Sequence, residues 1–499
     1  MMKQKNIILF LILITFLLKE IFLVALFPIF KGQDEARHYN TIQYLANDKQ
    51  KICNTKILDS TKQLKQDLNT YNFSDEIKKT SLIAQSRKIR GNDYERINFL
   101  ENSWDGIGEE QAKEKQIPYL QQSCFPDVVH NGNHFSFYHT VMSYWERHFQ
   151  QKNIFFRFYS LRLISVLLAS TIIVLVYYIF LNLGFSSKVS LILTAIFSFH
   201  PKIGIYFTNI NYDIFLILFW NFNILLTVLI LKKGWSWTRG VFYILSFILA
   251  LATKLTALAL VFPLLFLIYL GMKNEVKNKK QKLFIIWLIS FFFLLIILLF
   301  VSFLKTKIMV NNLFNWSSFK KYLITTIANL GINSNYWGKI KWGGKNSYFS
   351  VYIQEIKYLE WLAGIGLLLG CCFKGKLKFF IKKNKFLVEL WNMINFKNNI
   401  FKKQKKLIVL VIIYLLALQI TIRVADYVIY NTVGHGALGM PARYWLPNLS
   451  LHLALLVWGW KVLIKKENYL INLLLFFFLW IVLFNFYQVF NVIIPHFYL

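Results

Sequence analysis

Residues 161–184 read LRLISVLLASTIIVLVYYIFLNLG and carry no charge after Arg162. As a helix rising about 1.5 Å per residue, such a run crosses roughly 30 Å of hydrocarbon. Similar runs recur along the 499-residue chain, which is 56% hydrophobic and only 16% charged, whereas globular domains carry about 25% charged residues. The sequence therefore predicts an all-α integral membrane protein. It excludes a soluble enzyme, a disordered tail and a secreted disulfide scaffold.

Eleven transmembrane helices are expected. The first is an uncleaved anchor, because no small-x-small cleavage site follows it. The apolar piece 239–272 is too long for one straight span, and we divide it at Lys254. The expected spans are 6–26, 161–184, 188–208, 211–231, 239–253, 255–272, 283–304, 354–373, 407–429, 443–464 and 468–490.

These spans give the expected organisation of the chain. Residues 1–26 form the first helix, and 27–158 form a large extracytoplasmic loop with interfacial helices. Residues 159–304 contain helices 2–7, and 305–353 form a second extracytoplasmic loop. Residues 354–499 contain helices 8–11, with a basic cytoplasmic connector at 374–406.

The net charge of +33 is unevenly distributed. Residues 27–158 hold 18 basic and 16 acidic side chains, so nearly all the excess lies in the short connectors elsewhere. This is the positive-inside pattern, and it places the N-terminus and the connectors in the cytoplasm. It favours contact with the bilayer over nucleic-acid binding. The abundant Lys, Asn, Ile and Phe suggest an AT-rich bacterial genome, so we expect a multi-pass protein of the bacterial plasma membrane.

The large loop has helical character at both ends. An apolar stripe of Tyr39, Ile42 and Leu45 predicts an interfacial helix after Asp34, and another is expected before the second span. Cys53 and Cys124 lie in this loop, where a disulfide could form in an oxidising compartment.

Ionisable residues within or beside spans are costly and therefore mark functional sites. The topology places all of them at the outer face. They are Asp34, Glu35, Arg37, His38, Asp213, Lys254, Asp426 and Arg443. Such a cluster suits an anionic or hydroxyl-bearing substrate.

The segment Asp34-Glu35-Ala-Arg37-His38 is the sharpest signal. One carboxylate could act as a general base while the other orients it or holds substrate, and helix capping explains acids at a helix start equally well. Adjacent helical residues point about 100° apart, so the two acids should differ in role. Arg443, beside Tyr444, is suited to a phosphate because its planar fork binds two oxygens.

Other motifs are absent or incomplete. The stretch 434–439 matches G-x-G-x-x-G but lacks the strand and acidic residue of a dinucleotide site. No D-x-D, C-x-x-C or His/Cys metal pattern occurs, so no cofactor is expected, although a divalent metal is possible.

Several motifs occur in an order that resembles the GT-C class of membrane glycosyltransferases, above all its bacterial branch. That class includes protein O-mannosyltransferases and aminoarabinose-lipid transferases. The carrying stretches are Asp34-Glu35-Ala36-Arg37-His38, Arg162-Leu163-Ile164-Ser165, Asn211-Tyr212-Asp213, Lys254-Leu255-Thr256 and Arg443-Tyr444-Trp445-Leu446-Pro447. The chain departs from the pattern just before Asp34, where Gly32-Gln33 replace a proline, and at Ala442, which replaces a glycine.

The resemblance implies an inverting transfer of a sugar from a polyprenyl-phosphate donor at the outer face. The acceptor would be a cell-envelope glycan, lipid or protein, as in polysaccharide biosynthesis. An acid after the first span would be the base, so Asp34 and Glu35 are the catalytic candidates and Asp34 is preferred. The substrate-binding candidates are Arg37, His38, Asn211, Asp213, Lys254, Arg443 and Tyr444. No metal is implied.

Two other classes remain open from the residues. A polysaccharide polymerase or ligase would concentrate Arg and His in one late loop. A transporter of lipid-linked or anionic substrates would place charges near the bilayer midplane.

Overall fold

The structure is a computed structural model. It describes residues 2–30, 32, 34–47, 136–273, 317–318, 320–322, 336–337, 340–342, 345–347, 350–372, 399–433, 442–464 and 466–497. The loop cysteines, the predicted span 283–304, the G-x-G-x-x-G stretch and most of the basic connector 374–406 lie outside these ranges.

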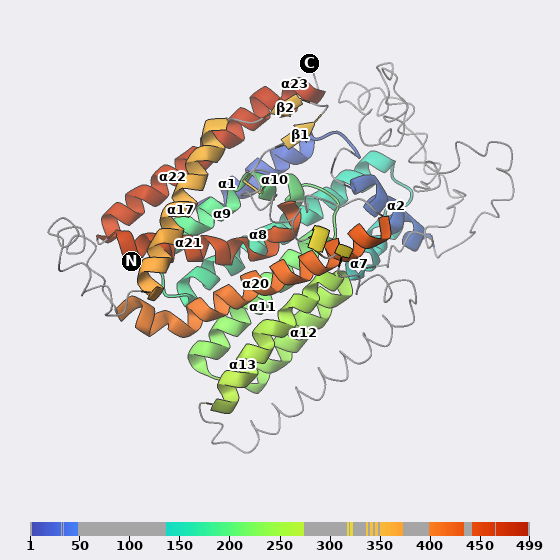
Figure 1. The fold of residues 1–499 in the computed structure, drawn as a ribbon. Helices are drawn as coiled ribbons and strands as arrows, with labels where there is room; N and C mark the ends of the chain where they lie inside the picture. Colours follow the sequence, from blue (N-terminus) through green and yellow to red (C-terminus); the bar gives the residue numbers. More distant parts are fainter. Residues whose placement is uncertain are drawn as a thin grey trace.

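The described chain is almost entirely helical (Figure 1). A short hairpin, in which β1 (Ile340–Trp342) pairs antiparallel with β2 (Lys345–Ser347), is the exception. The longer helices are α1 (Met2–Leu26), α2 (Glu35–Ala46), α7 (Phe137–His148), α8 (Ile154–Asn182), α9 (Ser187–Ser198), α11 (Asp213–Lys233), α12 (Trp237–Thr253), α13 (Val261–Lys273), α17 (Ser350–Cys372), α20 (Asn399–Val433), α21 (Leu449–Leu463) and α22 (Glu467–Gln488). The short elements are α10 (Pro201–Phe207), η2 (Leu255–Leu260), η3 (Ala442–Asn448), η4 (Val489–Ile493) and α23 (Ile494–Phe497).

Six of the described helices are long and apolar enough to cross a membrane. The count rises to seven if α9 and α10, bent by 58° to one another, form one broken span. The all-helical membrane class is therefore confirmed, whereas the prediction of eleven spans is not. Two further helical stretches are apolar but shorter than these spans. One is α12, and the other is Leu255–Leu270, which η2 and α13 form together.

Both breaks in the helical spans fall at identifiable residues. Pro201 begins α10, where a proline fits because the first helical N–H needs no intrahelical partner. Lys254 has extended backbone (φ −157°, ψ 133°) between the end of α12 and the start of η2. The break predicted at Lys254 is therefore present, and it places the positively charged Lys254 side chain within the helix bundle.

Helices α17 and α21 cross at small residues. A Cβ atom added at Gly366 would collide with the backbone carbonyl of Gly459, and one added at Gly459 would collide with that of Ala363. Small residues allow membrane helices to approach backbone to backbone, where dispersion contacts and weak hydrogen bonds hold them. This contact fixes α21 against α17.

Buried amides connect α11 to the C-terminal helices. Trp220 Nε1 donates to Asn448 Oδ1 (2.8 Å), and Asn448 Nδ2 donates to the carbonyl of Tyr414 (2.8 Å). Ser450 Oγ donates to Asn221 Oδ1 (2.8 Å). These bonds hold η3, and the start of α21, against α11. They bring the segment that contains Arg443 to the end of α11 that begins at Asp213.

Candidate active site

A buried ion pair anchors the chain between α1 and α2. Arg162 of α8 binds the Glu35 carboxylate through Nε (2.8 Å) and Nη2 (2.7 Å), and both side chains are 0% exposed. Glu35 also accepts the backbone N–H groups of Gly32 (2.9 Å) and Ile210 (3.0 Å). Arg162 donates to three carbonyls at the end of α1, those of Val24, Phe27 and Pro28. One ion pair therefore fixes the residues just before Asp34 and Asn211.

Asp34 precedes α2 in the left-handed backbone conformation (φ 58°, ψ 11°). A non-glycine residue in this region is uncommon and usually reflects a local constraint. Its side chain makes no capping hydrogen bond to α2, and it is 25% exposed. Helix capping therefore does not account for this carboxylate, which faces Arg443 instead.

Positively and negatively charged side chains alternate in a row near the starts of α2 and α11. Asp34 lies between Arg37 Nη1 (3.8 Å) and Arg443 Nη2 (2.6 Å). Arg443 Nε lies 3.7 Å from Asp213 Oδ2, and Asp213 Oδ1 accepts from Lys254 Nζ (2.7 Å). Four segments far apart in the sequence supply this row, which we call the charged row: Arg37, Asp34, Arg443, Asp213 and Lys254.

Two of the row's cations lie against aromatic rings. Lys254 Nζ is 4.7 Å from the ring centroid of Tyr212 and 4.2 Å from that of Tyr444. The guanidinium carbon of Arg443 lies 5.4 Å from the Tyr444 centroid. Ring quadrupoles attract cations, most strongly away from water. The rings thus hold the two cations near each other despite their like charge.

Arg443 retains unused hydrogen-bond donors. Its Nε and Nη1 are buried and have no hydrogen-bond partner within the described residues, while Nη2 is bound to Asp34. Asp213 Oδ2 is likewise buried without a hydrogen bond there. Buried donors without partners are uncommon and call for an explanation. Nε–H and the Nη1 hydrogens point to different sides of the guanidinium, so each nitrogen can donate to a separate acceptor.

The charges around Asp34 control its protonation. Burial raises the pKa of this carboxyl, but the charge and hydrogen bond of Arg443, together with the charge of Arg37, outweigh burial and hold the pKa below its usual value. Asp34 is therefore ionised at neutral pH.

A pair of stacked histidines lies beside the row. The backbone N–H of Ser136 donates to His139 Nδ1 (3.3 Å), so His139 carries its proton on Nε2. That N–H donates to His38 Nδ1 (2.9 Å), which assigns the His38 proton to Nε2. Burial lowers the pKa of His38 to about 3 and that of His139 well below its usual value. Both rings are therefore neutral at physiological pH, and Tyr212 packs edge-on against His38 (centroids 4.6 Å).

The structure brings together most of the residues singled out in the sequence. Asp34, Arg37, Asp213, Lys254 and Arg443 form the row, with His38 and Tyr444 beside it. Asn211 lies at the start of α11, where its Oδ1 accepts the backbone N–H of Asp213 (2.9 Å). Glu35 is turned away, onto Arg162.

Asp426 is not part of the charged row. It accepts from the Tyr322 hydroxyl (2.9 Å) and pairs with Arg423 (3.6 Å) instead.

Two contributors were not assigned a role from the sequence. Arg162 was visible as part of a motif, but its partner could not be known without the fold. His139 ends the stretch 134–139, which keeps part of a motif of the resembled class, but its contact with His38 could not be known without the fold. Within the described ranges, no group of three or more His, Cys, Asp or Glu side chains is placed to hold a metal ion.

Residues 139–303 match the family model of dolichyl-phosphate-mannose-protein mannosyltransferases. The match supports a GT-C-like glycosyltransferase, which confirms the resemblance seen in the motifs. Asp213 and Lys254 lie inside the matched stretch, whereas Asp34 and Arg443 lie outside it. No curated protein and no solved structure matches the chain.

Proposed function

We propose that the protein transfers a sugar from a polyprenyl-phosphate donor to a hydroxyl of a cell-envelope acceptor at the outer face of the bacterial plasma membrane. The family match supports a glycosyltransferase, and the name of the matched family refers to a polyprenyl-phosphate sugar. The acceptor is a glycan, a lipid or a protein. The reaction inverts the anomeric carbon, with Asp34 as the general base.

The observation that carries this proposal is the ion pair between the partly exposed carboxylate of Asp34 and the guanidinium of Arg443, which still has donors without hydrogen-bond partners within the described residues. Asp34 is 25% exposed, whereas the neighbouring Glu35 is 0% exposed and bound on both oxygens. Only Asp34 of the two can reach a substrate. Its partner Arg443 has two donors to spare.

Arg443 and Lys254 together suit the phosphate of the donor. Nη1 of Arg443 can donate to a phosphate oxygen while Nη2 stays on Asp34, so base and phosphate are held at neighbouring positions. Lys254, which forms an ion pair with Asp213, adds a second positive charge. Charge that develops on the departing phosphate is stabilised best by groups already in place.

The reaction then follows from these positions. The Asp34 carboxylate accepts the proton of the acceptor hydroxyl as the hydroxyl oxygen attacks the anomeric carbon from the face opposite the phosphate. The carbon–oxygen bond to the phosphate breaks, and the polyprenyl phosphate leaves with both electrons. Arg443 and Lys254 bind its negative charge. General-base assistance is worth about 10²–10⁴-fold in rate.

The remaining candidates have supporting roles in this proposal. Glu35 positions Asp34 through the Arg162 anchor and does not touch substrate. Arg37, His38, Asn211, Asp213 and Tyr444 shape the substrate site. The neutral His38 presents an N–H on Nε2 that can donate to a sugar or acceptor hydroxyl.

Arg443→Lys tests the phosphate assignment. Lysine keeps the charge but has one nitrogen, so it cannot bind Asp34 and a phosphate oxygen through separate nitrogens as arginine does. We expect polyprenyl-phosphate-sugar binding to weaken about 10–100-fold, the worth of one to two charge-assisted hydrogen bonds. Binding is measured with the purified protein in lipid nanodiscs. Arg423→Lys is the matched control, because Arg423 pairs with Asp426 away from the row. Equal affinity for wild type and Arg443→Lys would contradict the assignment.

A further inference from the structure

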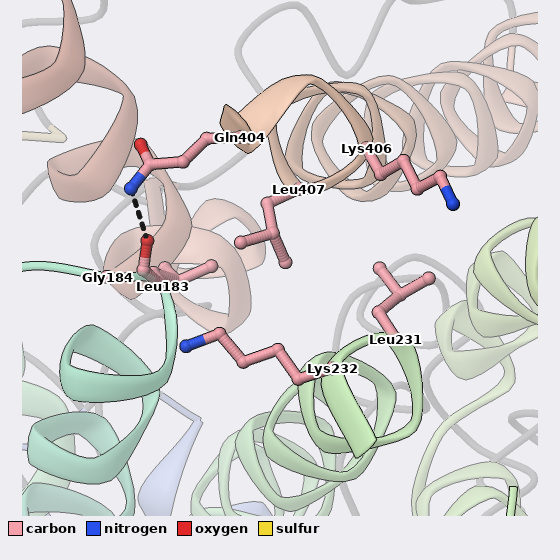
Figure 2. Close-up of a pocket in the computed structure, with 7 residues that line it drawn as sticks. All are labelled: Leu183, Gly184, Leu231, Lys232, Gln404, Lys406 and Leu407. Atoms are coloured by element: carbon pink, nitrogen blue, oxygen red, sulfur yellow. Dashed lines mark hydrogen bonds between the residues drawn. The ribbon is translucent and has the colours of Figure 1, made fainter. Parts of the chain in front are cut away.

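A second polar site lies at the opposite end of α11. A pocket of 560 Å³ opens between the turn that follows α8, the end of α11 and the first part of α20 (Figure 2). Its lining is Leu183, Gly184, Leu231, Lys232, Gln404, Lys406 and Leu407, and we call it the basic pocket. Its described lining contains two lysines and no acid. Within the described residues no carboxylate pairs with either lysine.

The pocket and the charged row lie on opposite sides of the bundle. Asp213 begins α11 and Lys232 lies at its other end, and 21 helical residues span about 30 Å, the thickness of the hydrocarbon core. The row and the pocket are therefore at opposite interfaces. Figure 1 shows the same separation, with α2 and α7 at one end of the bundle and the start of α20 at the other.

The polar groups of the pocket suit a particular ligand chemistry. Lys232 extends toward Gly184 and Gln404, whereas Lys406 lies at the far edge and its side chain extends away from these groups (Figure 2). Gln404 donates from Nε2 to the carbonyl of Leu183 (3.4 Å), which leaves its Oε1 buried without a hydrogen-bond partner within the described residues. The lysines call for an anion, and the free Oε1 calls for a hydroxyl donor.

The position of Gln404 is built into the fold. Gly184 has a positive φ of 91°, and a Cβ there would lie 2.6 Å from Gln404 Nε2. The positive φ favours glycine here, and without a Cβ at Gly184 the Gln404 amide packs directly against its backbone. Leu231 and Leu407 face each other across the pocket (Figure 2) and provide an apolar border next to the charged groups.

We propose that the basic pocket binds the headgroup of an anionic phospholipid that also carries hydroxyls, such as a phosphatidylglycerol of the inner leaflet. Lys232 binds the phosphate, Lys406 adds positive charge at the edge of the pocket, a headgroup hydroxyl donates to Gln404 Oε1, and the acyl chains leave past Leu231 and Leu407. Basic pockets between transmembrane helices on the cytoplasmic side are suited to such headgroups. The lipid would join α8, α11 and α20 at the interface.

The test compares two double variants with the same change in charge. Lys232→Gln with Lys406→Gln removes both lysines of the pocket, whereas Lys233→Gln with Lys405→Gln removes their exposed neighbours on the same helices. Binding of phosphatidylglycerol to the full-length protein in detergent is followed by native mass spectrometry. We expect the pocket variant to bind about 25-fold more weakly, about fivefold for each lysine, and the control less than about 3-fold more weakly. Equal losses in both variants would overturn the proposal, because surface charge alone would explain them.

Two further arms identify the ligand. Phosphatidylmethanol has the same charge as phosphatidylglycerol but no hydroxyl, so we expect wild type to prefer phosphatidylglycerol and Gln404→Met to lose that preference. Absence of a preference in wild type would overturn the hydroxyl contact. Inorganic phosphate at millimolar concentration should displace little lipid. Full displacement of the lipid would show that the pocket binds free anions, and it would contradict the proposal that its ligand is a phospholipid. Thermal melting of each variant confirms that it is folded.

Discussion

Asp34 and Glu35 are neighbours in the sequence with opposite environments. Glu35 has all its acceptor capacity taken by Arg162 and two backbone N–H groups. Asp34 is partly open to solvent, in a left-handed conformation that separates its side chain from α2. The buried acid holds the backbone so that the accessible acid stays beside Arg443. The difference in role expected for two adjacent acids has this physical basis.

The pH dependence of transfer should report on the ion pair of Asp34. A base must be ionised, and Arg443 helps to keep the pKa of Asp34 below its usual value. Wild-type kcat should therefore stay constant as pH falls from 7 until it approaches the ordinary carboxyl range, and it should decline only below that range. In Arg443→Gln the pKa of Asp34 rises, so the acid limb of kcat should move to higher pH. The profile is measured at saturating donor, with Arg423→Gln as the control. If the acid limb of kcat does not move, Asp34 is not the group whose ionisation limits kcat at low pH.

At the scale of elements, the sequence predicted several features correctly. The helix after Asp34 and the one before the second span exist as α2 and α7, because their apolar stripes bury against each other and against α8. The interruption at Lys254 was visible as a cation within an apolar run. The kink between α9 and α10 was not predicted, because the expected span 188–208 was drawn from its apolar length and the helix-breaking effect of Pro201 was not taken into account.

The crossing of α17 and α21 gives a prediction about stability. Gly366→Ala would place a methyl group against the Gly459 carbonyl, so we expect a loss of about 1–3 kcal/mol, typical of overpacking. Gly364 lies on the same helix, and a Cβ added there would have nothing within 4 Å, so Gly364→Ala should be neutral or slightly stabilising. Thermal melting in detergent compares the two. Similar melting temperatures would mean that the helices do not cross so closely.

At the scale of the whole molecule, the sequence predicted the class of protein but not which of its helices pack together. Composition and basic connectors were sufficient for a helical membrane protein, and the order of motifs was sufficient for the glycosyltransferase resemblance. Pairings such as Arg162 with Glu35, or His38 with His139, join residues more than 100 positions apart. No local pattern predicts them, since they depend on which helix faces pack. The predicted count of eleven spans likewise rested on local features, namely apolar length, the interruption at Lys254 and the positive-inside pattern.

The orientation of the chain remains a prediction from its charges. Single cysteines at Ser317 and Lys397 should react with membrane-impermeant reagents from opposite sides, Ser317 from outside and Lys397 from the cytoplasm. The physical reason is the density of basic residues in 374–406, which resists translocation. Labelling is compared in intact cells and in inverted vesicles. Reaction of both cysteines from one side would contradict the topology and the assignment of the charged row to the outer face.

The role of Asp34 as the base is decided by measuring binding and transfer separately for one substitution. Asp34→Asn is nearly isosteric; it removes the negative charge of the side chain, and with it both the ability to accept the proton and the ion pair with Arg443. In reconstituted membranes with a polyprenyl-phosphate sugar, we expect donor binding to persist while transfer falls by about 10²–10⁴-fold. Glu35→Gln serves as the comparison, and it should chiefly lower the melting temperature, because it leaves the buried Arg162 without its counter-charge. Full transfer by a well-folded Asp34→Asn protein would show that this carboxylate is not the base.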